Sequence, residues 1–216
     1  MLASAAITNL SATELKQLAV TSDNAAMLVY LNEAITELHK EFNIWQDEAI
    51  IAYSIGTYSY ALDGVDANVT IDLSDKVLLT ITNVYDYDGE ELRINDEDDL
   101  FGVVTPQYNV IEFPEDYDGE DPDITKGAEF SVLFRAAPID MTATTDTIVL
   151  PPTLHQAMYR YAAFRAYSSQ KNIEGQSESS VHYKRYLGEI NRVRNLGLIT
   201  PESIHTHKFD GSYPWP

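Results

Sequence analysis

Residues 147–170 read TIVLPPTLHQAMYRYAAFRAYSSQ, and the pattern of this stretch changes partway along. It opens with β-branched side chains, so we expect a strand over 147–150. Two prolines end that strand, because proline has no backbone N–H to offer a sheet. Thr153 is expected to cap a long helix that runs to about Gln170. Side chains at helical spacing give this helix its predicted apolar face, which comprises Leu154, Ala157, Met158, Tyr161, Ala162 and Phe164.

After a polar break, a further helix is predicted from about Ser179 to Asn195. Gly197 is the expected stop, because glycine readily adopts the left-handed conformation that ends many helices. Five side chains at helical spacing are expected to face inward: Tyr183, Tyr186, Leu187, Ile190 and Val193. Four basic side chains are left to solvent or to a partner: Lys184, Arg185, Arg192 and Arg194.

Two more helices are predicted at the N-terminal end. Ser11 and Glu14 have the spacing of a capping box, so we expect a short helix that starts at Ser11 and buries Leu15 and Leu18. A stronger amphipathic helix starts near Asn24. Its apolar side chains are Leu28, Leu31, Ala34, Ile35, Leu38 and Phe42.

The middle of the chain has the period of β-strands. The clearest candidate is KVLLTITNVYDY at 76–87, which Asp88-Gly89 follows as a type I′ hairpin signal. The remaining predicted strands cover 49–53, 57–62, 69–73, 91–94, 108–113 and 129–136. These segments predict a small antiparallel sheet, sandwich or barrel.

The predicted fold class is therefore α+β. Two N-terminal and two C-terminal helices would bury each other's apolar faces as a four-helix bundle, with the antiparallel β domain inserted between them. The expected division is a helical hairpin at 1–46, a β domain at 47–150, a second hairpin at 151–197 and an extended tail at 198–216.

The composition excludes several classes of protein. The 216 residues include 34 acidic and 14 basic ones, a net charge of −20, which disfavours general binding to nucleic-acid backbones or to anionic membranes. The chain has no cysteine, which excludes disulfides, cysteine zinc sites and cysteine nucleophiles. The sequence contains no apolar run of about 18 residues, so no membrane span is predicted. The first residues lack the basic region of a signal peptide, so synthesis inside a cell is expected.

The charge is concentrated in one part of the chain. Residues 84–124 hold 15 acidic residues and one basic residue, Arg93. One interpretation is a solvated loop face; the other is a surface that repels something, or that meets a basic partner. The acidic residues of this candidate surface are Asp96, Glu97, Asp98, Asp99, Glu115, Asp116, Asp118, Glu120 and Asp121.

Motifs for catalysis and cofactors were not found. The chain has no GxSxG, GxGxxG or GxxxxGK[ST], so neither a hydrolase elbow nor a nucleotide loop is predicted. The acidic clusters that start at Asp86 and Asp116 lack the glycine and glutamate of an EF-hand loop, although looser binding of Ca²⁺ or Mg²⁺ stays open. His205 and His207 form an HxH pair for which the sequence specifies no third ligand. We expect no catalytic residues, no metal site and no cofactor.

The last eight residues, FDGSYPWP, hold Phe209, Tyr213 and Trp215. Two prolines restrict this segment, which lowers the entropy that docking would cost. The aromatic side chains are therefore expected to anchor the tail on a partner, the alternative being a tail that folds back on its own domain.

Three stretches together resemble the head-to-tail adaptor, or connector, proteins of short-tailed bacteriophages. They are the N-terminal helix pair that ends at Glu41-Phe42, the segment LTITNVYDYDGEEL at 79–92, and residues 147–170 followed by SSVHYKRYLGEINRVRNLG at 179–197. The resemblance implies a structural protein of the virion neck, made in the host cytoplasm and without enzymatic activity.

The same resemblance implies a ring, with twelve copies as the expected number, bound beneath the portal protein. Such a ring extends the channel through which DNA passes without sequence-specific binding, and it offers a platform for tail or nozzle proteins. The resemblance thus implies that the acidic surface from Asp96 to Asp99 and from Glu115 to Asp121 lines or rims this channel. The four basic residues of the last helix and the three aromatic residues of the tail are the expected portal or subunit contacts. Two other hypotheses stay open: a soluble calcium- or carbohydrate-binding β module of a virion, and a hydrolase that uses a pair of carboxylates.

Overall fold

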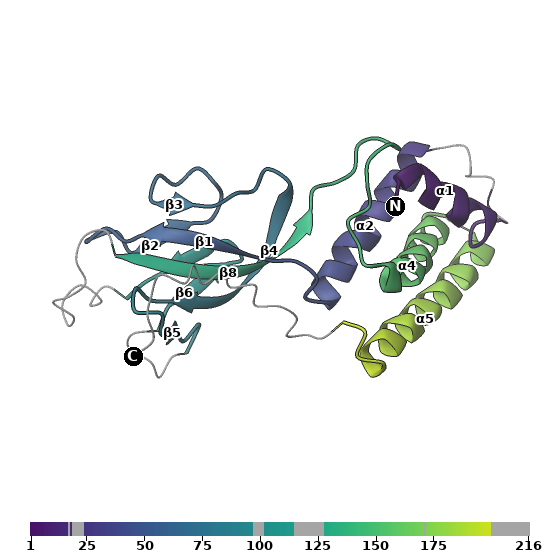
Figure 1. Ribbon diagram of the computed structural model, residues 1–216. Coiled ribbons are helices and arrows are strands. Elements are labelled where there is room, and N and C mark those ends of the chain that lie inside the picture. The colour runs from purple at the N-terminus through teal and green to yellow at the C-terminus, as the bar shows by residue number, and fades with distance from the viewer. Residues whose placement is uncertain (17, 19–23, 97–101, 115–127, 171, 200–216) are drawn as a thin grey trace.

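The computed structural model describes residues 1–16, 18, 24–96, 102–114, 128–170 and 172–199. Its helices gather in one half of the molecule and its strands in the other, and each half encloses an apolar core (Figure 1). The expected α+β class with antiparallel sheets is confirmed.

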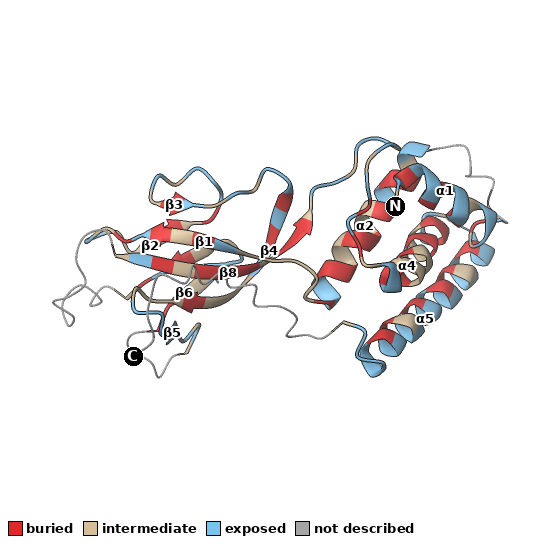
Figure 2. Ribbon diagram, viewed as in Figure 1, coloured by how far each residue is buried: buried red, intermediate tan, exposed pale blue. Residues whose placement is uncertain are grey.

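The helical half is built in layers. Helix α4 (His155–Ser168) lies between α2 (Asn24–Glu41) and α5 (Ile173–Asn195), and α1 (Ala3–Ala12) packs against α2. The four helices share one core, and Figure 2 shows their buried sides turned toward each other. The side chains that periodicity predicted for α2 are all buried: Leu28, Leu31, Ala34, Ile35, Leu38 and the neighbouring Phe42.

The expected start of the first helix at Ser11 is wrong. Helix α1 begins at Ala3, and Ser11 lies in its last turn. The backbone N–H groups of Ala3 and Ser4 donate to the carbonyl oxygens of Asp146 and Thr144, at 2.9 and 2.8 Å. A segment distant in sequence thus satisfies donors that a helix start leaves free, so no side-chain cap is needed.

The sheet half contains two antiparallel sheets. The larger has the order β3-β1-β8-β4-β5, with β8 (Glu129–Pro138) in the centre. Its other strands are β1 (Gln46–Ala52), β3 (Val69–Thr70), β4 (Lys76–Tyr85) and β5 (Glu91–Leu92). The smaller has the order β2-β7-β6, made by Ser59–Ala61, Val110–Glu112 and Val104–Gln107. Aromatic rings form the centre of the core in this half: Tyr53, Tyr60, Phe113 and Phe130.

The predicted hairpin after β4 forms, but its turn type differs from the prediction. Val84 pairs with Leu92 and Tyr85 with Glu91, as a return strand requires. A type I′ turn needs positive φ at both central residues, whereas Gly89 has a φ of 83° and Asp88 does not have a positive φ. The Asp86 carboxylate instead accepts the N–H groups of Asp88 and Glu90, at 3.0 and 2.8 Å, and holds the loop.

Residues 139–150 connect β8 to the C-terminal helices, and we call them the strap. The strand expected at 147–150 reduces to a single bridge between Thr147 and Leu2. The strap lies along α2, where Asn32 exchanges two hydrogen bonds with the backbone of Met141, each 3.0 Å long. It is followed by a 3₁₀ turn, η2 (Pro152–Leu154), and Thr153 does not cap α4.

Helix α5 begins earlier than expected. Asn172 caps it by accepting the Gly175 N–H at 2.7 Å, so the helix runs from Ile173 rather than from about Ser179. Its end is as predicted, because Gly197 has a φ of 59° and donates its N–H to Arg194 O.

Candidate interaction surface

The outer face of α5 is broad because only a narrow stripe of the helix is buried. That stripe consists of Gly175, Ser179, His182, Tyr186, Ile190 and Val193. Tyr186, Ile190 and Val193 were predicted to face inward, and they do. Tyr183 and Leu187 were predicted to do so as well, but they are 41% and 42% exposed. The correction follows from the packing, since α4 alone covers most of this helix and reaches only one side of it.

The four basic residues predicted as contacts fall into two pairs. Arg192 lies 2.7 Å from Glu189, and Arg194 lies 2.5 Å from Glu41 and over the ring of Phe42. These two guanidinium groups therefore already form ion pairs within their own chain. Lys184 and Arg185 are exposed and form no ion pair with any residue that the structure describes. They are the free cations of the α5 face.

Aromatic rings line the seam between α4 and α5 beside these cations. Tyr161 lies 5.5 Å from Phe164 and 5.1 Å from Tyr186, and Phe164 lies 5.0 Å from Tyr183, all between ring centroids. Burial raises the pKa of Tyr186 above its usual value, so this hydroxyl stays neutral at any physiological pH. The sequence showed the aromatic residues but not that Tyr183 and Leu187 would end at the surface.

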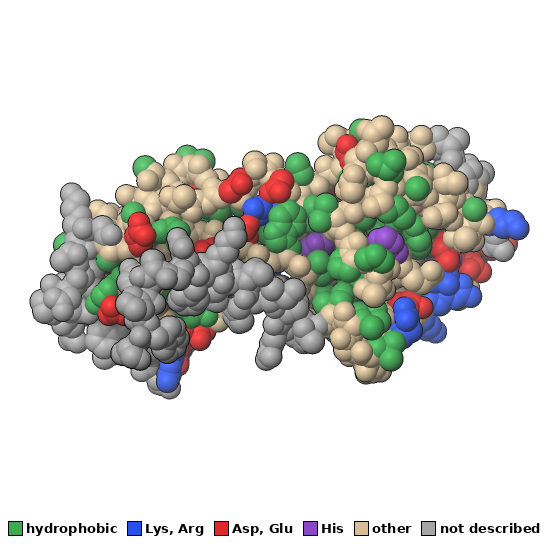
Figure 3. All heavy atoms as spheres, viewed as in Figure 1, with side chains coloured by type: hydrophobic (Ala, Val, Ile, Leu, Met, Phe, Trp, Pro, Cys, Tyr) green, Lys and Arg blue, Asp and Glu red, His purple; other side chains and the backbone are tan. Residues whose placement is uncertain are grey.

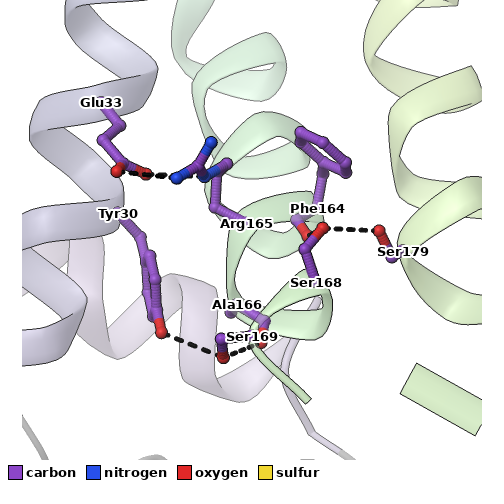
Figure 4. Close-up of polar contacts among 8 residues, drawn as sticks. All are labelled: Tyr30, Glu33, Phe164, Arg165, Ala166, Ser168, Ser169 and Ser179. Carbon is purple, nitrogen blue, oxygen red and sulfur yellow. Dashed lines mark hydrogen bonds and ion pairs between the residues drawn. The ribbon is translucent and has the colours of Figure 1, made fainter. Parts of the chain in front are cut away.

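Polar contacts hold the three helices behind this surface in register. Figure 4 shows Arg165 against Glu33, with the Nε–Oε2 distance at 2.8 Å, and Tyr30 within 3.2 Å of Ser169. The hydroxyl groups of Ser168 and Ser179 are 2.7 Å apart and join α4 to α5. These contacts join α2 to α4 and α4 to α5, and so they hold α5 in place behind its outer face.

A buried polar cluster, which sequence reasoning missed, ties the end of α1 to α4 and α5. The Glu14 carboxylate pairs with Arg160 and lies 3.5 Å from Nδ1 of His182. The His182 ring stacks on Tyr167 at 5.1 Å. Burial lowers the pKa of His182, and the Glu14 charge opposes that effect in part. The local pattern around Ser11 predicts a capping role for Glu14, so no signal in the sequence points to this pairing.

At the junction of the two halves, Lys76 lies 2.5 Å from Asp47 and 5.4 Å from the centre of the Trp45 ring. Burial alone would lower the pKa of Lys76, but the Asp47 hydrogen bond and charge together with Asp75 raise it. Lys76 is therefore positively charged, and it lies in the sheet half, where acidic residues outnumber basic ones.

The predicted acidic surface is described only at Asp96, whose carboxylate lies 3.0 Å from Arg93. The other predicted acidic residues lie outside the described residues: Glu97, Asp98, Asp99, Glu115, Asp116, Asp118, Glu120 and Asp121. The same holds for the tail residues Phe209, Tyr213 and Trp215 and for the HxH pair. Figure 3 shows acidic side chains on the sheet half. Among the described residues, no three possible metal ligands gather, and no helix is long and apolar enough to cross a membrane.

Comparison with known proteins points to one family. The family model described as SU10 adaptor protein matches residues 2–202, which is nearly the whole chain. No curated protein matches the sequence. The family match thus covers both the helical and the sheet half, together with the α5 face described above.

Proposed function

The chain belongs to the SU10 adaptor protein family, and from that membership we propose that it is a head-to-tail adaptor in the neck of a bacteriophage virion. Membership confirms the adaptor part of the resemblance and implies a structural rather than an enzymatic role. The proposal goes further. Copies of the chain, with twelve as the expected number, form a ring beneath the portal of a short-tailed phage and present a platform for tail or nozzle proteins.

The observation that carries this proposal is the α5 face. Lys184 and Arg185 are exposed and unpaired among the described residues, and Tyr183 and Leu187 expose large apolar surfaces beside them. Tyrosine and arginine are typical of the residues that contribute most at protein interfaces. A helix with this combination is suited to bind another protein.

The acidic sheet half supports a role beside passing DNA. Residues 46–138 hold 22 acidic and 4 basic residues, a net charge of −18. A surface of this charge repels the phosphate backbone, so DNA would move past it without adhering. In this proposal the channel is lined or rimmed by Asp96, Glu97, Asp98, Asp99, Glu115, Asp116, Asp118, Glu120 and Asp121.

The proposed division of the chain agrees with the two cores except at the strap, because Ile148 and Leu150 belong to the helical core. The helical hairpins 1–46 and 151–197 form a four-helix bundle for subunit and portal contacts, the inserted segment 47–150 forms the β domain, and the tail 198–216 docks on the portal. Phe209, Tyr213 and Trp215 would be the anchors of that tail, since aromatic side chains bury much area for little entropy.

The test is the sedimentation mass of the protein, alone and mixed with the portal protein encoded by the same genome. We expect the chain to bind the portal protein in a fixed ratio. A chain that does not bind the portal protein would contradict the proposal. A truncated chain that lacks 209–216 should keep its fold, as measured by circular dichroism, but should no longer bind the portal protein. The matched control is Arg93→Ala, which removes a basic residue from the sheet half and should leave portal binding unchanged.

A further inference from the structure

The helical half has two outer faces, one on each side of its layers. The strap lies against α2, α2 packs on α4, and α4 packs on α5 (Figure 1). The α5 face, defined by Tyr183, Lys184, Arg185 and Leu187, therefore lies on one side of the stack. The strap face, defined by Val29, Ile139, Asp140 and Val149, lies on the other side.

Both faces expose apolar side chains that no described segment of their own chain covers. On the strap face, Val29, Ile139 and Val149 are 53%, 51% and 50% exposed. Ile139 and Val149 also line a shallow recess between the strap and α2. Tyr183 and Leu187 provide the apolar part of the α5 face. Two separate apolar faces on one molecule fit a head-to-tail contact, in which each copy uses one face for each neighbour.

The free charges on the two faces are opposite. The α5 face carries Lys184 and Arg185, whereas the strap, residues 139–150, carries acidic residues and no basic one. Asp140 is exposed and forms no ion pair with any other residue that the structure describes. A contact between the faces would place Asp140 near the two cations, so the pairing is complementary in charge as well as in apolar character.

Charge also argues against contacts through the sheet half. The sheet segment 46–138 carries a net charge of −18, whereas the helical segments 1–45 and 139–199 together hold 10 acidic and 9 basic residues. Two sheet halves pressed together would repel each other strongly at distances below the screening length, roughly 8 Å in physiological salt. The nearly neutral helical halves can approach without that cost.

We propose that a second copy of this chain binds the α5 face through its strap face, so that neighbouring copies pack head to tail through their helical halves. This inference rests on the proposed ring and names the two surfaces that form it. A head-to-tail contact closes into a ring when its rotation divides a full turn, and it leaves every sheet half on the same side of the assembly.

Because the chain has no cysteine, single introduced thiols report on single positions. Leu187→Cys probes the α5 face, Val149→Cys probes the strap face, and Val104→Cys on β6, where Val104 is 49% exposed, is the matched control. Each variant is alkylated with N-ethylmaleimide as the free chain and as the assembly on the portal. We expect alkylation on assembly to slow about tenfold or more at positions 187 and 149, because interface cores exclude water, and to be unchanged at 104.

A double variant tests the direction of the contact. Leu187→Cys with Val149→Cys, treated with a short bismaleimide, should give a ladder of dimers, trimers and higher species. Either single variant should give no ladder, and neither should Leu187→Cys with Val104→Cys.

Assembled protein in which thiol 187 or 149 reacts as fast as in the free chain would overturn the proposed contact and leave the adaptor role standing. So would a Leu187→Cys single variant that crosslinks mainly to itself, because that marks a two-fold contact. A wild-type chain that never assembles, even with the portal, would overturn the ring and this contact together.

Discussion

The Nη2 atom of Arg135 lies 2.5 Å from the carbonyl oxygen of His39. The same nitrogen lies 2.8 Å from Lys40 O and 2.9 Å from Phe42 O. These carbonyls belong to the last turn of α2 and the residue after it, where a helix leaves acceptors without partners. Arg135 sits in the central strand β8, so one cation closes the end of α2 and joins the helical half to the sheet half.

Replacing Arg135 with methionine should destabilise the protein substantially. The substitution leaves three carbonyls without their charged donor, and hydrogen bonds of that kind contribute about 1.5–3 kcal/mol. We expect the free energy of unfolding, measured in urea, to fall by about 2–3 kcal/mol. Arg93→Met, which breaks an exposed pair with Asp96, is the control and should change it by less than about 1 kcal/mol. Equal urea midpoints for the two variants would contradict the assigned role of Arg135.

Glu14→Gln should weaken the attachment of α1 to the other helices. The Glu14 side chain is 9% exposed and pairs with Arg160, so the substitution leaves a guanidinium partly buried without its counter-charge. Breaking one side of a buried pair costs about 3 kcal/mol or more, and that loss should appear in urea unfolding. Glu189→Gln breaks the more exposed pair with Arg192 and should cost less than about 1 kcal/mol. A Glu14 variant as stable as the Glu189 variant would show that the buried pair contributes little.

Acid should destabilise the helical half through two buried histidines. Burial lowers the pKa values of both His39 and His182 below 6.5. At His39 the Ile35 carbonyl opposes this effect and the Arg135 charge adds to it. At His182 the Glu14 charge opposes it, while Arg185 and Arg160 add to it. The unfolded chain therefore binds more protons near pH 6, so this contribution to stability is complete above 6.5 and falls as the pH drops toward the lowered values.

The measurement is urea unfolding between about pH 7.5 and about pH 5, for the wild type and for the double variant His39→Gln, His182→Gln. We expect a shallower loss of stability in the double variant, because it lacks the two histidines that take up protons on unfolding. Parallel pH curves would mean that the two histidines keep their ordinary pKa values in the folded protein.

Two glycines of α5 should respond in opposite directions to alanine. A Cβ at Gly188 would meet nothing within 4 Å, so Gly188→Ala should stabilise the protein by about 0.5–1 kcal/mol. A Cβ at Gly175 would lie 2.5 Å from Gln170 Cβ and 2.8 Å from Asn172 Oδ1. Gly175→Ala should therefore cost about 1–3 kcal/mol and disturb the Asn172 cap. Thermal unfolding of the two variants checks this, and a shift of the same sign in both would contradict the described α4–α5 turn.

Local patterns were sufficient for α2, for β4 and for the end of α5. Leu28, Leu31, Ile35 and Leu38 recur at helical spacing, and all are buried on α2. The β-branched and aromatic side chains of 76–87 marked β4, and Gly197 marked the end of α5. These features depend on neighbours within a few residues, so the order of the amino acids is enough to recognise them.

Several of the missed features depend on contacts between distant segments. Helix α1 starts at Ala3 because Asp146 and Thr144 accept its first N–H groups. Glu14 pairs with Arg160, far along the chain, and no local pattern connects the two. Arg135 did offer a signal, since an arginine within the apolar strand EFSVLFRAAP needs a partner, but the sequence could not say that the partner is the end of α2.

By itself the sequence determined the α+β class, the positions of helix α2 and strand β4, and the concentration of negative charge between residues 46 and 138. Only the tertiary structure decided which cations remain free and that Tyr183 and Leu187 lie at the surface. The reason is geometric. Helical periodicity predicts which side of α5 is apolar. The width of its buried stripe depends on how many other helices pack against it, and α4 covers only one side of α5.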